Sequence, residues 1–202
     1  MEELLTNLDE IRFSLNGGFC MRSRILILLS IVISVFCCCS SRGQSVPRFV
    51  FHNLEMEYPG YFEISDETLS QGDSLVSFVL KSKNNPSTRI EFGINLIPAD
   101  FLSRVPEEEL MGELVATVFD MKSRLFTTAG VIVENFGDVQ VSEPGTRPEA
   151  YAFALVSDEG SSYYYILSSM IVGNYSINSV SISGDPTEME LLTSVMDNIK
   201  CN

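Results

Sequence analysis

Three consecutive cysteines, Cys37–Cys39, are the residues of this 202-residue chain whose type and spacing most clearly indicate chemistry. Adjacent thiols can bind a metal, form disulfides or carry lipid. Zinc sites use spaced ligands such as Cys-x₂-Cys with further Cys or His downstream, but His52 is the single histidine. A disulfide framework needs cysteines spread through a small domain, and the remainder of the body has only Cys201. Lipid attachment therefore fits the cluster best.

The segment before these cysteines has the layout of a secretory signal. Arg22 and Arg24 form a positive start, and residues 25–36 are an uncharged stretch that is apolar except for two serines. A membrane-spanning helix needs about 20 residues, so this stretch is too short to cross a bilayer. Residues 1–20 carry four acidic residues and one basic residue, which does not suit a signal. We expect translation to start at Met21, and a genuine N-terminal extension is the alternative.

A cysteine at the end of such a segment resembles the lipobox of bacterial lipoproteins. In that family the signal is cut before a cysteine that follows small residues, with an aliphatic residue at position −3. Cys38 fits best, with Val35 at −3 and Cys37 at −1, and Cys39 is the alternative. Phe36, at −2 of Cys38, departs from the usual small residue and leaves the choice between the two open.

The lipobox resemblance implies a lipid-anchored protein of the bacterial cell envelope, with the membrane as a partner. Residues 21–38 are then the lipoprotein signal peptide, residues 39–47 a flexible polar tether, and residues 48–202 a single folded domain. Lipoproteins of the Bacteroides type that reach the outer face have an acidic run after the cysteine, and none follows here. The resemblance thus favours an outer-membrane anchor that faces the periplasm. Juxtamembrane palmitoylation is the competing lipid chemistry, but it requires a spanning helix or a second anchor.

Acidic residues dominate the body of the chain. From residue 44 onward there are 23 acidic and nine basic residues, so the body carries the whole formal charge of −14. Such a surface repels phosphate backbones, and nucleic acid is not an expected partner. Glu107, Glu108 and Glu109 are adjacent, but acidic residues in the first turn of a helix compensate the helix dipole more often than they bind a cation.

Two periodicities alternate along the body. Apolar residues at every second position, bounded by turn residues, predict strands. They fall at residues 48–54, on both sides of the Tyr58-Pro59-Gly60 turn, and at 74–82, 88–97, 131–142, 149–157, 162–172 and 175–183. The last three, joined by very short loops, must be antiparallel neighbours. Helical spacing predicts a helix that begins at Pro106 and ends before Gly130, and a second one after the N-cap Asp185, with Met189, Leu192, Met196 and Ile199 on its apolar face.

Three stretches carry a resemblance to a known family: EYPGYFEIS, the long central helix, and YSINSVSISG leading into LLTSVMDNIK. They resemble the photosystem II extrinsic protein PsbP and related bacterial lipoproteins, over residues 49–200. The resemblance implies an α+β fold, with an antiparallel β-sheet flanked by helices in an α/β/α sandwich, and an accessory or binding role. Metal-binding residues described for some members have no counterpart here, because the matching histidines are missing.

Catalytic motifs are not recognisable in the chain. It lacks G-x-S-x-G, H-E-x-x-H, a P-loop and a dinucleotide-binding glycine pattern, so we assign no catalytic, cofactor-binding or metal residues. Tyr163–Tyr165 alternate between faces and indicate sheet packing, and Cys201 indicates an inert thiol. We therefore expect a non-catalytic binding or assembly module with an envelope protein as partner. The alternative is a hydrolase or carbohydrate-active accessory domain that uses two of the 23 carboxylates.

Overall fold

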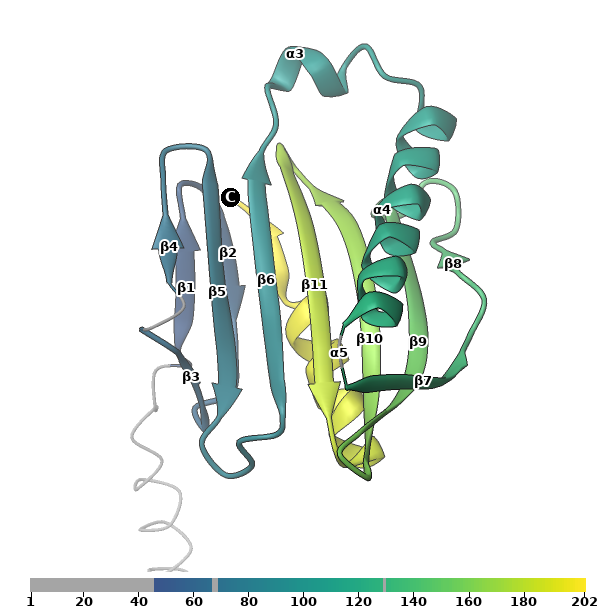
Figure 1. The fold of residues 1–202 in the computed structure, drawn as a ribbon. Coiled ribbons are helices and arrows are strands. Elements are labelled where there is room, and N and C mark those ends of the chain that lie inside the picture. Colours follow the sequence, from purple (N-terminus) through teal and green to yellow (C-terminus); the bar gives the residue numbers. More distant parts are fainter. Residues whose placement is uncertain (1–45, 67–68, 129) are drawn as a thin grey trace, which may run out of the picture. The chain divides into compact units, whose positions relative to one another are not determined.

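The structure is a computed structural model, and it describes residues 46–66, 69–128 and 130–202. Residues 46–202 form one compact unit, in which an antiparallel sheet has α4 (Glu107–Thr127) on one face and α5 (Met189–Asp197) on the other (Figure 1). This is the α+β class that the sequence predicts. The predictions for Cys37–Cys39, for the signal and for the tether up to residue 45 lie outside the described residues.

The larger sheet contains the predicted antiparallel meander. Its strand order is β3-β5-β6-β11-β10-β9-β7, with β4 paired to β5 and β8 to β9. β9, β10 and β11 are antiparallel neighbours, and the turns between them are tight, as predicted. In chain order the strands are β3 (Phe62–Ile64), β4 (Ser70–Gln71), β5 (Leu75–Ser82), β6 (Arg89–Leu96), β7 (Val131–Phe136), β8 (Gln140–Val141), β9 (Glu149–Asp158), β10 (Ser161–Val172) and β11 (Tyr175–Ser183).

A second, small sheet has the strand order β1-β2-β12, with β1 (Arg48–Phe51), β2 (Leu54–Glu57) and β12 (Ile199–Cys201). The sequence predicts one strand over residues 48–54, and this is wrong. The chain reverses at His52, whose φ of +53° lies in the left-handed region, so that Phe51 pairs with Leu54 across a two-residue turn. The alternation of apolar residues does not reveal a turn that is made by a single residue with positive φ.

The two predicted helices are present, but their bounds differ from the prediction, since Pro106 is the N-cap of α4 and its first helical residue is Glu107. α4 follows Pro106 and ends before Gly130, whose φ is +84°. Two further short helices are α3 (Ala99–Leu102) and the 3₁₀ helix η1 (Pro186–Glu188). The prediction that Ile199 belongs to the last helix is wrong, because α5 ends at Asp197. Ile199 lies in β12 opposite Met56, where its backbone pairs with the edge of β2 and its side chain is still buried.

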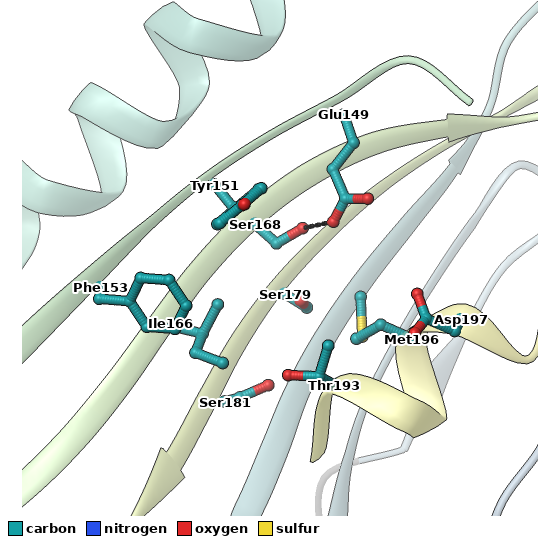
Figure 2. A pocket seen from close by; sticks show the side chains of 10 residues that line it. All are labelled: Glu149, Tyr151, Phe153, Ile166, Ser168, Ser179, Ser181, Thr193, Met196 and Asp197. Carbon is teal, nitrogen blue, oxygen red and sulfur yellow. Dashed lines mark hydrogen bonds between the residues drawn. The ribbon is translucent and has the colours of Figure 1, made fainter. Parts of the chain in front are cut away.

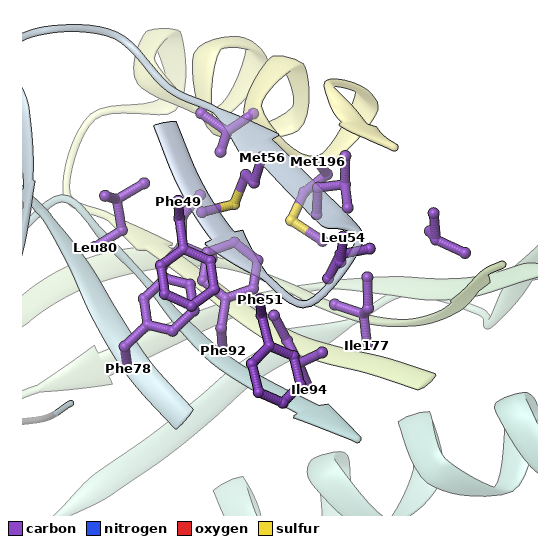
Figure 3. Close-up of a cluster of buried hydrophobic side chains, with 14 of the residues drawn as sticks. Phe49, Phe51, Leu54, Met56, Phe78, Leu80, Phe92, Ile94, Ile177 and Met196 are labelled. Carbon is purple, nitrogen blue, oxygen red and sulfur yellow. The ribbon is translucent and has the colours of Figure 1, made fainter. Parts of the chain in front are cut away.

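Each face of the larger sheet has its own hydrophobic core. Under α4, the side chains of Leu114 and Val118 pack on Ala150 and Ala152 of β9, whose small size lets the helix approach the sheet. On the other face, α5 and the small sheet cover β5, β6 and β11 with a core rich in phenylalanine (Figure 3). We call this second face the α5 face.

Both ends of α5 are fixed to the larger sheet by polar contacts. At its start, the Glu188 carboxylate accepts hydrogen bonds from Asn85 Nδ2 at 3.0 Å, Ser183 Oγ at 2.9 Å and the Thr88 hydroxyl. At its end, Arg147 Nη1 donates to the carbonyl of Met196 at 3.1 Å. These contacts hold the helix over one part of β11 and leave the neighbouring part of the sheet uncovered.

Candidate functional site

A pocket of about 270 Å³ lies beside α5 on the uncovered part of the α5 face. Strands β9, β10 and β11 supply its floor and one wall, and α5 supplies the opposite wall (Figure 2). We call it the serine pocket. It is lined by Glu149, Tyr151 and Phe153 of β9, Ile166 and Ser168 of β10, Ser179 and Ser181 of β11, and Thr193, Met196 and Asp197 at α5.

Small side chains create the hollow. Residues at every second position of β11 point to the α5 face. Tyr175 and Ile177 there are large, fully buried and part of the core, whereas Ser179 and Ser181 are small. On β10, Ser168 lies directly opposite Ser179 in the register. The pocket therefore lies where the strands carry serines instead of bulky side chains, and α5 does not fill the space above them.

Ser179 is polar, buried and without a partner. The residue is 2% exposed, and among the described residues Ser179 Oγ is the buried side-chain polar atom that has no hydrogen-bond partner. Buried polar groups are hydrogen-bonded in the large majority of cases, and one that is not costs about 1–3 kcal/mol. The hydroxyl lies at the centre of the floor of the serine pocket (Figure 2).

Charged side chains gather at one end of the pocket. Glu149 accepts a hydrogen bond from Ser168 Oγ at 3.0 Å through one oxygen and from Arg147 Nη2 at 3.0 Å through the other. The same Arg147 nitrogen lies 3.6 Å from Asp197 Oδ1. One guanidinium thus holds two carboxylates at the rim of the serine pocket, and the rim carries a net charge of −1.

The wall opposite α5 is apolar. Tyr151 and Phe153 stand next to each other on β9 with their rings perpendicular, at 88° and a centroid separation of 5.8 Å. The Tyr151 hydroxyl donates to Gln140 Oε1 at 2.7 Å, which fixes its ring. Phe153 is 48% exposed, and Ile132 of the adjoining strand β7 is 67% exposed. A large apolar side chain at the exposure of Phe153, at the edge of a pocket, is typical of a binding surface.

The sequence-predicted positions lie elsewhere. His52 is in the β1–β2 turn, where Nε2 is 2.9 Å from the carbonyl oxygen of Asp73. Cys201 is an exposed free thiol that accepts a hydrogen bond from Asn53 Nδ2 at 3.0 Å. The three glutamates of residues 107–109 are in the first turn of α4 and exposed.

The tyrosine triplet is sheet packing, as predicted. Tyr165 packs against the core under α4, and its burial raises the pKa of the phenol. Tyr164 alternates to the opposite face, where it pairs with Leu155 of β9. The serine pocket is not among the features predicted from the sequence, although its floor lies in the stretch YSINSVSISG. One sequence signal was available. Along the face of β11 that carries Tyr175 and Ile177, the next two positions are the serines Ser179 and Ser181.

The described residues contain neither a membrane-spanning helix nor a metal-binding cluster. No helix among residues 46–66, 69–128 and 130–202 is long and apolar enough to cross a membrane. The same residues contain no group of three or more histidine, cysteine, aspartate or glutamate side chains arranged to hold a metal ion.

Comparison with known proteins gives matches of structure only. No protein-family model matches the chain, and no curated protein matches its sequence. The solution structure of cyanobacterial PsbP (CyanoP) from Synechocystis is similar at 14% identity and a TM-score of 0.49, over 80% of this chain and 96% of that one. A PsbP structure is thus among the neighbours, as the sequence resemblance predicts.

A crystal structure from Bacteroides thetaiotaomicron is similar at 13% identity and a TM-score of 0.48, over 79% of this chain. This chain spans about half of that protein, 49% of its length. At these identities and TM-scores, neither match carries information about activity, ligand or partner.

Proposed function

We propose that this chain is a lipid-anchored protein of the bacterial envelope whose folded body is a non-catalytic binding module, and that the serine pocket is its binding site. The observation that supports the binding site is the Ser179 hydroxyl, which is buried and unpartnered in a residue that lines a hollow between a helix and a sheet. Positions at which a sequence breaks the rules of stable packing tend to be functional.

A purely structural role does not account for these side chains. The same face of the sheet is filled elsewhere by Ile94, Ile177 and Phe92, and an aliphatic residue at 179 would extend that core at no polar cost. Instead the chain places a hydroxyl there and leaves Phe153 half-exposed at the pocket's edge. A ligand that partners the hydroxyl and covers the ring would satisfy both.

The binding site can be tested with the methyl group of Met196, which lines the serine pocket. In the full chain labelled with ¹³C-methyl methionine, a fragment library should contain compounds that shift the Met196 signal in a saturable way. The signals of Met111 and Met121, on the opposite side of the sheet, serve as the internal control and should not move. A library that leaves Met196 unchanged would contradict the proposed site.

The lipid anchor is proposed on Cys38, with Cys39 as the alternative, from the lipobox resemblance alone. It would attach the body to the outer membrane on the periplasmic side and bring it near an envelope protein partner. Palmitate labelling in a bacterial host tests this. We expect label in the natural chain and none in a Cys38→Ser, Cys39→Ser double variant, and normal labelling of that variant would exclude both residues.

A carboxylate-pair hydrolase is the second candidate, and one observation favours it: Glu149 and Asp197 line the same pocket. Both, however, contact the one guanidinium of Arg147, which ties them together at the rim, whereas glycoside hydrolysis needs two carboxyl groups placed to act separately on the substrate. We therefore expect no hydrolysis of chromogenic glycosides. Hydrolysis by the natural chain that disappears in Glu149→Gln would replace the binding proposal with the enzymatic one.

A further inference from the structure

We propose that the serine pocket takes a single uncharged polyhydroxylated ring, that is, one sugar unit, free or at the end of a glycan. This inference rests on the proposed binding function and specifies its ligand. It follows from four properties of the pocket: its size, its charge, the direction of its hydrogen bonds and its apolar wall.

The size of the pocket limits the ligand to one ring. Pockets that hold drug-sized molecules have volumes of about 300–1,000 Å³, and the serine pocket, at about 270 Å³, lies just below that range. The contacts at both ends of α5, through Glu188 and Arg147, keep the helix from moving away to enlarge it.

The charge of the pocket excludes anions. Glu149 and Asp197 outnumber Arg147 at the rim, and the body as a whole carries −14. A phosphate or carboxylate ligand would therefore meet repulsion from both. A cation would lose its hydration against a mostly apolar wall, while the two carboxylates are already paired with Arg147. An uncharged ligand avoids both costs.

The pocket offers mainly hydrogen-bond acceptors. The Ser168 hydroxyl already donates to Glu149, and the Thr193 hydroxyl donates to the carbonyl of Met189 at 2.9 Å. Each hydroxyl therefore presents only lone pairs to the pocket, and the carboxylates of Glu149 and Asp197 are acceptors as well. Ser179 adds one hydroxyl that can donate or accept. A ligand that matches this set must carry several donors, as a polyol does.

The remaining surface suits the apolar face of a ring. Phe153 and Ile166 form a flat wall beside the hydroxyl floor, and Met196 faces them from α5 (Figure 2). A sugar ring has carbon–hydrogen faces and a rim of hydroxyls. It can place one face against Phe153 while its hydroxyls reach the floor and the Glu149 end.

The test is a titration of the full chain, labelled with ¹³C-methyl methionine, against six one-ring probes. Three are neutral sugars (glucose, galactose and N-acetylglucosamine), and the others are glucuronate, benzylamine and cyclohexanol. At least one neutral sugar should shift the Met196 methyl signal to saturation. Glucuronate should bind at least about tenfold more weakly than that sugar, because it adds a charge of the wrong sign.

Two variants link the response to the floor. Ser179→Ala removes the hydroxyl and should weaken binding of the sugar by about three- to tenfold, the range for one hydrogen bond. Ser176→Ala, on the other face of β11, is the matched control and should leave binding unchanged. Equal binding by Ser179→Ala and the natural chain would overturn the role given to the floor.

The outcomes separate the ligand class from the site. If benzylamine or cyclohexanol shifts Met196 and no neutral sugar does, the sugar proposal is wrong and the pocket remains a binding site. If none of the six probes shifts Met196, the sugar proposal is wrong, and a fragment library without effect would remove the proposed site too.

Discussion

The two halves of strand β11 present side chains to the same face of the sheet, but one half is part of a closed core and the other lines a pocket. Tyr175 and Ile177 are 1% and 0% exposed and belong to a closed core under α5 and the small sheet. Ser179 and Ser181 are equally inaccessible, but they form the floor of a hollow. Strand, register and face are common to all four positions, so the difference is one of side-chain size and of what packs above. A single strand can thus supply a core at one end and the floor of a pocket at the other.

The largest loss of stability should come from a substitution in the half of β11 that belongs to the core. Ile177→Ala removes a fully buried side chain from the core and should lower the free energy of unfolding by about 2–5 kcal/mol. Ser181→Ala, four residues further along the same face, removes only a hydroxyl and should change it by at most about 1 kcal/mol. Urea denaturation followed by circular dichroism measures both. Similar losses in the two variants would mean that the halves do not differ.

A smaller effect should come from the rim of the serine pocket. Arg147→Met removes the guanidinium that contacts Glu149, Asp197 and the last turn of α5. Because these side chains are partly exposed, solvent screens the ion pairs, and we expect a loss of about 1–2 kcal/mol in the free energy of unfolding. Arg124→Met, which removes an exposed pair on α4, should cost less than about 0.5 kcal/mol.

Removing the unpartnered hydroxyl should have the opposite sign. Ser179→Ala leaves the shape of the floor nearly unchanged and deletes a buried polar group that has no partner. We expect the free energy of unfolding to rise by about 1 kcal/mol. Ser183→Ala is the comparison, because Ser183 Oγ donates to Glu188, and its loss should destabilise by a similar amount. The two serines of one strand should therefore shift the urea midpoint in opposite directions.

The smallest effect on stability concerns Glu55, in the small sheet that covers the core around Tyr175 and Ile177. Hydrogen bonds from Arg48 and Asn202 lower the pKa of Glu55. Since the folded pKa lies below the ordinary value of 4.5, ionised Glu55 stabilises the fold above that pH, and this contribution is lost as the pH falls through the lowered pKa. Glu55→Gln should therefore flatten the acid side of the stability profile between pH 7 and pH 3, and Glu143→Gln, in an exposed loop, should not.

Much of the fold was predictable because its signals are local. Ile90, Phe92 and Ile94 alternate without interruption, and the strand they predict is β6. The tight turns between β9, β10 and β11 predict antiparallel neighbours, and the structure confirms them. Errors arose where the deciding contact is distant. Ile199 fits the helical spacing, but the edge of β2 draws it into a strand.

The serine pocket was not predictable for the same reason. Alternation places Ser179 and Ser181 on the face of Ile177, but whether small residues leave a hollow depends on how far α5 extends over them. That distance is set by contacts far apart in the sequence, between Glu188 and Thr88 and between Arg147 and Met196. The proximity of Glu149 to Asp197 has the same origin. These residues are 48 positions apart in the sequence, but both contact the side chain of Arg147.

One variant tests most directly whether the hollow half of β11 is a site. Ser179→Val fills the floor with apolar atoms and removes the unpartnered hydroxyl. If the account is right, its free energy of unfolding rises, because the hollow becomes core, while the Met196 methyl signal no longer responds to the sugar that shifts it in the natural chain. If Ser179→Val instead loses stability as Ile177→Ala does, or binds as before, the floor of the serine pocket is ordinary packing and the account is contradicted.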